Sequence, residues 1–125
     1  MDRRDLDERL LTYGARVIKL VESLPRTLVG RRIGDQLLRS ATSAGANYEE
    51  ARGAESRSDF VHKMQVALKE LRESHYWLRL LMKAEILPVD RLADLLDEAT
   101  QLRAIPVKVR RDNKRKGKSR GKLEP

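Results

Sequence analysis

Apolar residues along this chain recur at spacings of three and four, which is the period of one face of an α-helix. No alternation of apolar and polar residues is long enough to indicate a strand. The pattern predicts four helices, at residues 5–24, 27–54, 56–87 and 88–105. Pro25, Pro88 and Pro106 lie at their boundaries, because proline disfavours helical angles in the residue before it and lacks a backbone N–H. Thr27 and Ser56 are the predicted N-caps of the second and third helices.

The second predicted helix contains the stretch Thr42–Asn47, whose glycine and polar residues suggest a break as an alternative. An interior glycine costs about 1 kcal/mol of helix propensity relative to alanine. However, the apolar positions pass through this stretch without a change of phase, at Leu37, Ala41, Ala44 and Tyr48. We therefore predict one continuous helix, about 42 Å long, whose small residues allow close contact with a neighbouring helix.

The third predicted helix has a wider apolar surface than one neighbouring helix needs, because a second strip that includes Tyr76 and Trp77 lies beside the main one. Four amphipathic helices with short connections predict an antiparallel up-down-up-down four-helix bundle, with the longer second and third helices as its central hairpin. Part of the wide surface is expected to face another subunit. The predicted oligomer interface comprises Gly34, Ala41, Gly45, Tyr76 and Trp77.

Charge divides the chain into two parts. The chain has 125 residues and a net charge of +8, of which residues 107–125, with nine basic and two acidic residues, contribute +7. The sequence therefore predicts a four-helix bundle over residues 1–105 and a disordered, flexible basic tail over residues 106–125. Such a polycation favours a polyanionic partner, above all a nucleic acid. The candidate binding residues of the tail are Lys108, Arg110, Arg111, Lys114, Arg115, Lys116, Lys118, Arg120 and Lys122.

The start of the second helix offers a second candidate nucleic-acid surface, made of Arg26, Arg31, Arg32 and Arg39. Arg32 and Arg39 are seven residues apart and share a helix face. Asp35 lies between them, so local ion pairing competes with binding.

No motif indicates an enzyme. The chain has no cysteine, and His62 and His75 are too far apart on one helix to share a turn. Asp59 and His62 form half of a carboxylate-bridged metal motif, but the second histidine motif is absent. We therefore expect no metal, cofactor or small-molecule substrate. The alternative for the acids Glu49, Glu50, Glu70 and Glu73 is that they are solvated or paired with Arg52, Lys69 and Arg72.

Membrane association is not expected either. No stretch approaches the roughly 18 apolar residues of a spanning helix, and a polybasic tail alone binds membranes weakly without an apolar insertion. The charged N-terminus does not resemble a signal peptide, so the sequence predicts a cytoplasmic protein.

Residues 24–81 carry several specific blocks in a fixed order. The blocks are Gly34-Asp35-Gln36-Leu37, Arg39-Ser40-Ala41-Thr42-Ser43, Gly45-Ala46-Asn47, Ser58-Asp59-Phe60, and Lys69-Glu70 with Glu73 before Tyr76-Trp77-Leu78. In these blocks the chain resembles the bacterial "four helix bundle protein" family, also called the 23S rRNA intervening-sequence protein family. The tail lies outside the resemblance.

The resemblance implies a four-helix bundle that assembles into a homopentameric ring and has no catalytic residues. It also implies similarity to the accessory variability determinant of diversity-generating retroelements, a basic pentamer that binds nucleic acid and a reverse transcriptase. We therefore predict a non-enzymatic, homopentameric accessory protein that binds nucleic acid, either RNA or an RNA/DNA hybrid. The alternative is a protein–protein adaptor, or an accessory subunit of a reverse transcriptase in such a retroelement.

Overall fold

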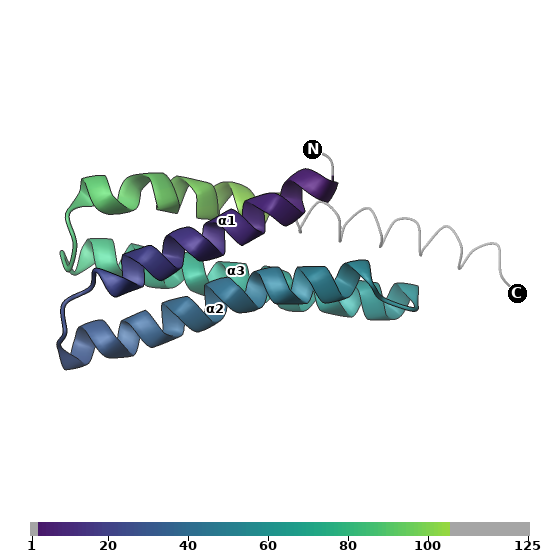
Figure 1. The fold of residues 1–125 in the computed structure, drawn as a ribbon, viewed down its shortest axis with the longest axis horizontal. Helices are drawn as coiled ribbons and strands as arrows, with labels where there is room; N and C mark the ends of the chain where they lie inside the picture. The colour runs from purple at the N-terminus through teal and green to yellow at the C-terminus, as the bar shows by residue number, and fades with distance from the viewer. Residues whose placement is uncertain (1–2, 106–125) are drawn as a thin grey trace, which may run out of the picture.

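The computed structural model describes residues 3–105, which form four helices. These are α1 (Arg3–Glu22), α2 (Leu28–Arg52), α3 (Arg57–Lys83) and a fourth helix over residues 89–105. They run alternately up and down, with α1 between the fourth helix and α2, and with α3 behind (Figure 1). No strand occurs in the described part of the chain. The prediction of an all-α antiparallel four-helix bundle is confirmed, whereas the predicted tail lies outside the described residues.

Both predicted N-caps are present. The side chain of Thr27 accepts a hydrogen bond from the backbone N–H of Gly30 at 3.1 Å, and that of Ser56 accepts one from Asp59 at 3.1 Å. Each cap has an extended backbone and satisfies one of the N–H groups that have no partner inside the helix. The sequence therefore determines where α2 and α3 begin.

The end of α3 differs from the prediction, which extended this helix to residue 87. Glu85 has a φ of 56°, in the left-handed region, and α3 ends just before it, at Lys83. The N–H of Ile86 donates to the carbonyl of Leu81, and the N–H of Glu85 donates to that of Met82, both at 3.1 Å. These two bonds form a Schellman motif, in which glycine usually occupies the position that Glu85 holds here. The helix end was missed because the sequence carries no glycine at this place.

Helix α2 is continuous through Thr42–Asn47, as predicted. The polar side chains of this region bond to the helix's own carbonyl groups, so they need no break in the helix. Thr42 donates to the carbonyl of Leu38 at 2.7 Å, and Asn47 donates to that of Ser43 at 2.9 Å.

The small residues of α2 are used largely inside one chain. A Cβ added to Gly34 would lie 3.2 Å from side-chain atoms of both Val21 and Leu24, so glycine permits the close approach of α1. Ala41 is fully buried in the bundle core. Gly34 and Ala41, which were predicted at the oligomer interface, therefore lie within the protomer, because α1 covers the side of α2 to which they belong.

One buried polar pair lies in the apolar core. The hydroxyl groups of Tyr13 and Ser74 are hydrogen-bonded at 2.8 Å, and Ser74 also donates to the carbonyl of Leu71. Burial raises the pKa of Tyr13 to about 12, so the phenol remains neutral. Around this pair the core is apolar along the bundle. Candidate binding residues are therefore sought at exposed positions.

Candidate nucleic-acid interface

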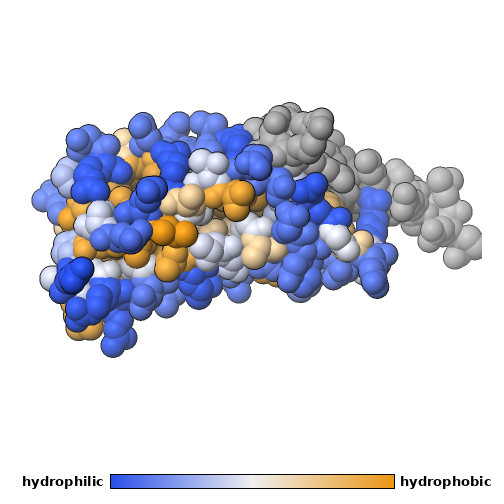
Figure 2. All heavy atoms as spheres, viewed as in Figure 1, coloured by the Kyte–Doolittle hydropathy of each residue, from blue (hydrophilic) through white to orange (hydrophobic). Residues whose placement is uncertain are grey.

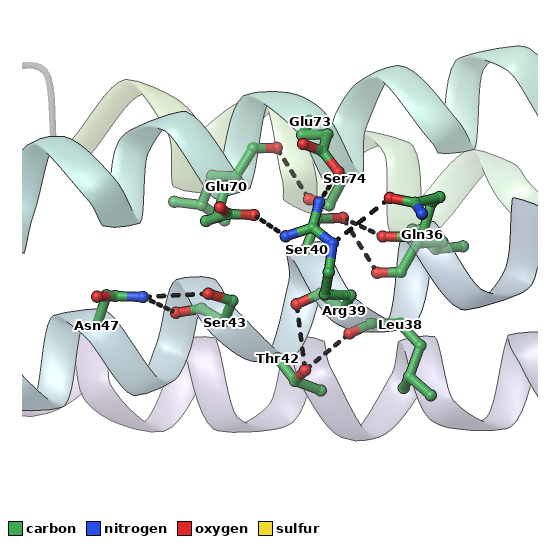
Figure 3. Close-up of polar contacts among 12 residues, drawn as sticks. Gln36, Leu38, Arg39, Ser40, Thr42, Ser43, Asn47, Glu70, Glu73 and Ser74 are labelled. Carbon is green, nitrogen blue, oxygen red and sulfur yellow. Dashed lines mark hydrogen bonds and ion pairs between the residues drawn. The ribbon is translucent and has the colours of Figure 1, made fainter.

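Arg39 is held between α2 and α3 by two carboxylates (Figure 3). Its Nη1 donates to Glu70 Oε2 at 3.0 Å, and its Nη2 donates to Glu73. The hydrogen bond to Glu73, and to a smaller extent the one to Glu70, raises the pKa of Arg39 above its usual range. Glu70 is buried, with 8% of its surface exposed, so the ion pair supplies the partner that a buried charge requires. Arg39 therefore links α2 to α3 through its guanidinium.

The same glutamate positions Trp77, whose indole N–H donates to Glu73 Oε2 at 3.2 Å. Trp77 is half-buried against the core, whereas 53% of Tyr76 is exposed. The two rings meet edge to face, with their centroids 5.1 Å apart. The two aromatic residues of the predicted oligomer interface thus have different environments, and Tyr76 is the one available to a ligand or partner.

Arg26, Arg31 and Arg32 lie together at the end of the bundle where α2 begins, and all three are exposed. Arg31 donates to the backbone carbonyl of Arg26 at 3.3 Å. Among residues 3–105 none of these arginines forms an ion pair with a carboxylate, Asp35 included. The four arginines predicted here therefore differ in their partners: Arg39 is bound to Glu70 and Glu73, whereas the other three have no carboxylate partner among residues 3–105.

The tail residues predicted to bind nucleic acid lie outside the described residues. The fourth helix runs from residue 89 to residue 105 and is about 25 Å long. Its start lies at the end of the bundle that carries the α2 arginines (Figure 1). The arginine cluster and the point where the tail begins are thus separated by the length of this helix.

Sequence reasoning missed four cations of α3. Lys69 and Arg72 were considered as partners for the neighbouring glutamates, but Glu70 and Glu73 bind Arg39 instead. Lys69, Arg72, Arg79 and Lys83 are all exposed, and no ion pair to a carboxylate within residues 3–105 involves them. Their spacing of three, seven and four residues was the available signal. It was obscured by the acids between them in the sequence.

Other acids of the bundle are also paired within the chain. Glu98 of the fourth helix binds Arg9 of α1 at 2.6 Å. Arg52 of α2 binds Asp7 at 2.7 Å and Glu49 at 3.5 Å, so the predicted pairing of Glu49 with Arg52 is confirmed. The neighbouring Asp7 raises the pKa of Glu49. These pairs tie the helices together and reduce the number of carboxylates that compete for the remaining cations.

His75 joins α3 to the fourth helix. Its Nδ1 lies 2.9 Å from Nη1 of Arg103, and its Nε2 lies 3.2 Å from Oγ1 of Thr100. Burial, with Arg103 and Arg79 nearby, lowers the pKa of His75. A neutral ring that accepts from Arg103 and donates to Thr100 satisfies both nitrogens, which is a structural arrangement. Within residues 3–105 no group of three or more His, Asp and Glu side chains is placed to hold a metal ion.

A shallow apolar groove of about 550 Å³ runs between α1 and α2. Leu11 and Ile18 of α1 border it, with 69% and 43% of their surfaces exposed, and Gly45 lies on its α2 side. Figure 2, which views this face, shows apolar side chains exposed along its middle. Asp7 and Glu49 lie at one end of the groove.

No helix in the described part of the chain is long and apolar enough to cross a membrane.

Comparison with known proteins places this fold in a family. The model of the 23S rRNA-intervening sequence proteins matches residues 9–108. The chain belongs to this family. A crystal structure of a protein from the S23 ribosomal protein family of Bacteroides thetaiotaomicron VPI-5482, whose function is unknown, is 31% identical with a TM-score of 0.75. The match covers 84% of this chain and 97% of that one. Comparison with curated proteins gives no significant match.

Proposed function

We propose that this protein is a non-enzymatic RNA-binding accessory protein that acts as a homopentameric ring. The observation that carries the proposal is the distribution of charge. The chain has a net charge of +8, and residues 107–125 contribute +7 of it. In the bundle, Asp7, Glu70 and Glu98 are each bound to an arginine. Membership of a family named after an insertion in 23S rRNA favours RNA as the polyanion.

Assembly would multiply the effect of the tail. Five tails on one ring would carry a charge of about +35, and linked weak contacts can raise avidity by about two to four orders of magnitude. The apolar groove between α1 and α2, with its exposed Leu11 and Ile18, supports self-association, because monomeric proteins rarely expose contiguous apolar surface without a partner. A long structured RNA suits such an assembly better than a small ligand does.

Binding of the full-length chain to RNA across a salt series tests the proposal. If six to nine tail cations contact phosphates, log affinity should fall against log salt with a slope of about −5 to −8. The first comparison is a chain truncated after Ile105. The second is a full-length chain in which the nine basic residues of the tail are glutamine, so that length is unchanged. Both should bind at least tenfold more weakly, with a smaller slope.

Two results would count against the proposal in different ways. Equal binding by the full-length and truncated chains would show that the tail is not the binding element. Absence of RNA binding by the full-length chain at moderate salt would reject the function itself. Mass determination in solution tests the assembly separately, since a monomer would remove the avidity argument.

A further inference from the structure

We propose that one face of α3 is a built RNA-binding stripe, which extends the proposed function and rests on it. Five exposed side chains follow one another at intervals of three and four residues, which places them along a single helix face about 21 Å long. The stripe consists of Lys69, Arg72, Tyr76, Arg79 and Lys83. Four cations with one aromatic ring among them are the combination that binds a phosphate backbone and stacks a base.

The cations of the stripe remain available because the acids of α3 point elsewhere. Glu70 and Glu73 lie on the side of α3 that faces α2, where both bind Arg39. On the other side, the fourth helix meets α3 through Thr100 and Arg103, which both contact His75. Within residues 3–105, neither flank therefore places a carboxylate in an ion pair with the stripe.

Tyr76 is fixed in a position suited to stacking. Tyr76 is 53% exposed, and its ring meets that of Trp77 edge to face, at an interplanar angle of 74°, so Trp77 supports the ring while much of the residue stays accessible. Glu73 holds Trp77 in turn through its indole N–H. A hollow of about 430 Å³ lies beside the ring, bordered by Leu80 and Met82 and by the cations Arg79 and Lys83. A base in this hollow would contact an apolar surface while its phosphates contact the cations.

The stripe also leads toward the start of the tail. The fourth helix runs antiparallel to α3, and Arg103 lies 2.9 Å from His75, in the middle of the stripe. Residue 105, where the described chain ends, follows within one turn of that contact. The described chain thus ends beside the Arg72 half of the stripe.

Fluorescence anisotropy of a labelled single-stranded RNA of mixed sequence, with the full-length protein in a salt series, tests the stripe. The double variant Arg72→Gln/Arg79→Gln removes two phosphate contacts, so the magnitude of the salt slope should fall by about 1.4. The control, Arg16→Gln/Lys19→Gln, removes the same charge from exposed positions of α1 and should leave the slope nearly unchanged.

Tyr76→Leu separates stacking from charge. It should weaken binding of single-stranded RNA by about tenfold, at an unchanged salt slope, because stacking does not release counterions. Binding of duplex RNA should be unaffected, since paired bases cannot stack on a side chain. Circular dichroism and mass determination of each variant check that its fold and assembly are unchanged. Arg72, Tyr76 and Arg79 are all on the surface, so the variants should fold as the wild type does.

The possible outcomes distinguish the two proposals. If the wild-type chain binds RNA and the arginine double variant keeps its slope, the stripe is wrong while the proposed function stands. If the wild-type chain binds no RNA, the proposed function fails and the stripe with it. If the variants lose binding only together with a fall in the mass of the assembly, the stripe is a subunit contact and the inference is overturned.

Discussion

Neighbouring residues of α3 with opposite charges face different surroundings. Lys69 and Glu70 are adjacent in the sequence, as are Arg72 and Glu73, and each pair is neutral as a whole. Successive residues of a helix point about 100° apart, so the two glutamates reach Arg39 on α2 while Lys69 and Arg72 face outward. Residues 69–73, which have no net charge, thereby direct both of their cations away from both of their carboxylates.

Two glycines with different surroundings provide a test at the same scale. A Cβ on Gly30 would lie 2.1 Å from the backbone oxygen of Pro25, which cannot move without displacing the turn between α1 and α2. A Cβ on Gly14 would meet nothing within 4 Å. Gly30→Ala should lower the free energy of unfolding by about 1–3 kcal/mol. Gly14→Ala should raise it by up to about 1 kcal/mol through helix propensity.

Urea unfolding followed by circular dichroism measures both changes, and each variant serves as the control for the other. Equal effects of the two substitutions would contradict this account, because propensity alone would then govern both positions. A stabilised Gly30→Ala chain would mean that the turn at Pro25 has freedom that its close contacts do not indicate.

At the scale of helices, the sequence was sufficient where local rules act alone. The N-caps at Thr27 and Ser56 and the continuity of α2 follow from side-chain chemistry and periodicity, and the structure confirms them. The end of α3 was missed because Glu85 adopts a left-handed conformation that residue type does not indicate. The α3 stripe was missed because the partner of Glu70 and Glu73 is Arg39, more than thirty residues earlier in the sequence.

The contact between α3 and the fourth helix should make stability depend on pH. His75 has a pKa below its ordinary value of 6.5 in the folded chain, because of burial and nearby arginines. The unfolded chain therefore binds the proton more readily. The stability that neutral His75 contributes is present above about pH 6.5 and is lost as the pH falls through the lower, folded pKa.

Replacing His75 by glutamine isolates this effect. Glutamine can accept from Arg103 and donate to Thr100, but it does not titrate. The wild-type chain should lose more stability than His75→Gln between about pH 8 and about pH 5, measured as the shift in the urea midpoint. Parallel pH profiles for the two proteins would show that His75 is not responsible.

At the scale of the whole molecule, the α3 stripe and the apolar groove lie on different helices. The exposed cations of α3 lie along one face of that helix, whereas the apolar groove lies between α1 and α2. In a ring, a self-association surface that does not overlap a nucleic-acid surface lets both be occupied together. The groove has a small-residue floor that includes Gly14 and Gly45, and exposed Leu11 and Ile18 at its border, which suits the entry of side chains from a second copy.

Leu11→Glu tests whether the groove is the subunit contact. Leu11 is 69% exposed in the single chain, so glutamate should fold without cost there, but a buried carboxylate without a partner would oppose assembly. Mass determination in solution should then show a lighter species with unchanged helix content. Leu28→Glu is the matched control, because Leu28 is 62% exposed and lies outside the groove, and it should leave the mass unchanged.

If both variants keep the mass of the wild-type assembly, the ring is held by another surface. If the lighter Leu11→Glu protein binds RNA with the affinity of the wild type, avidity between tails is not what holds the RNA.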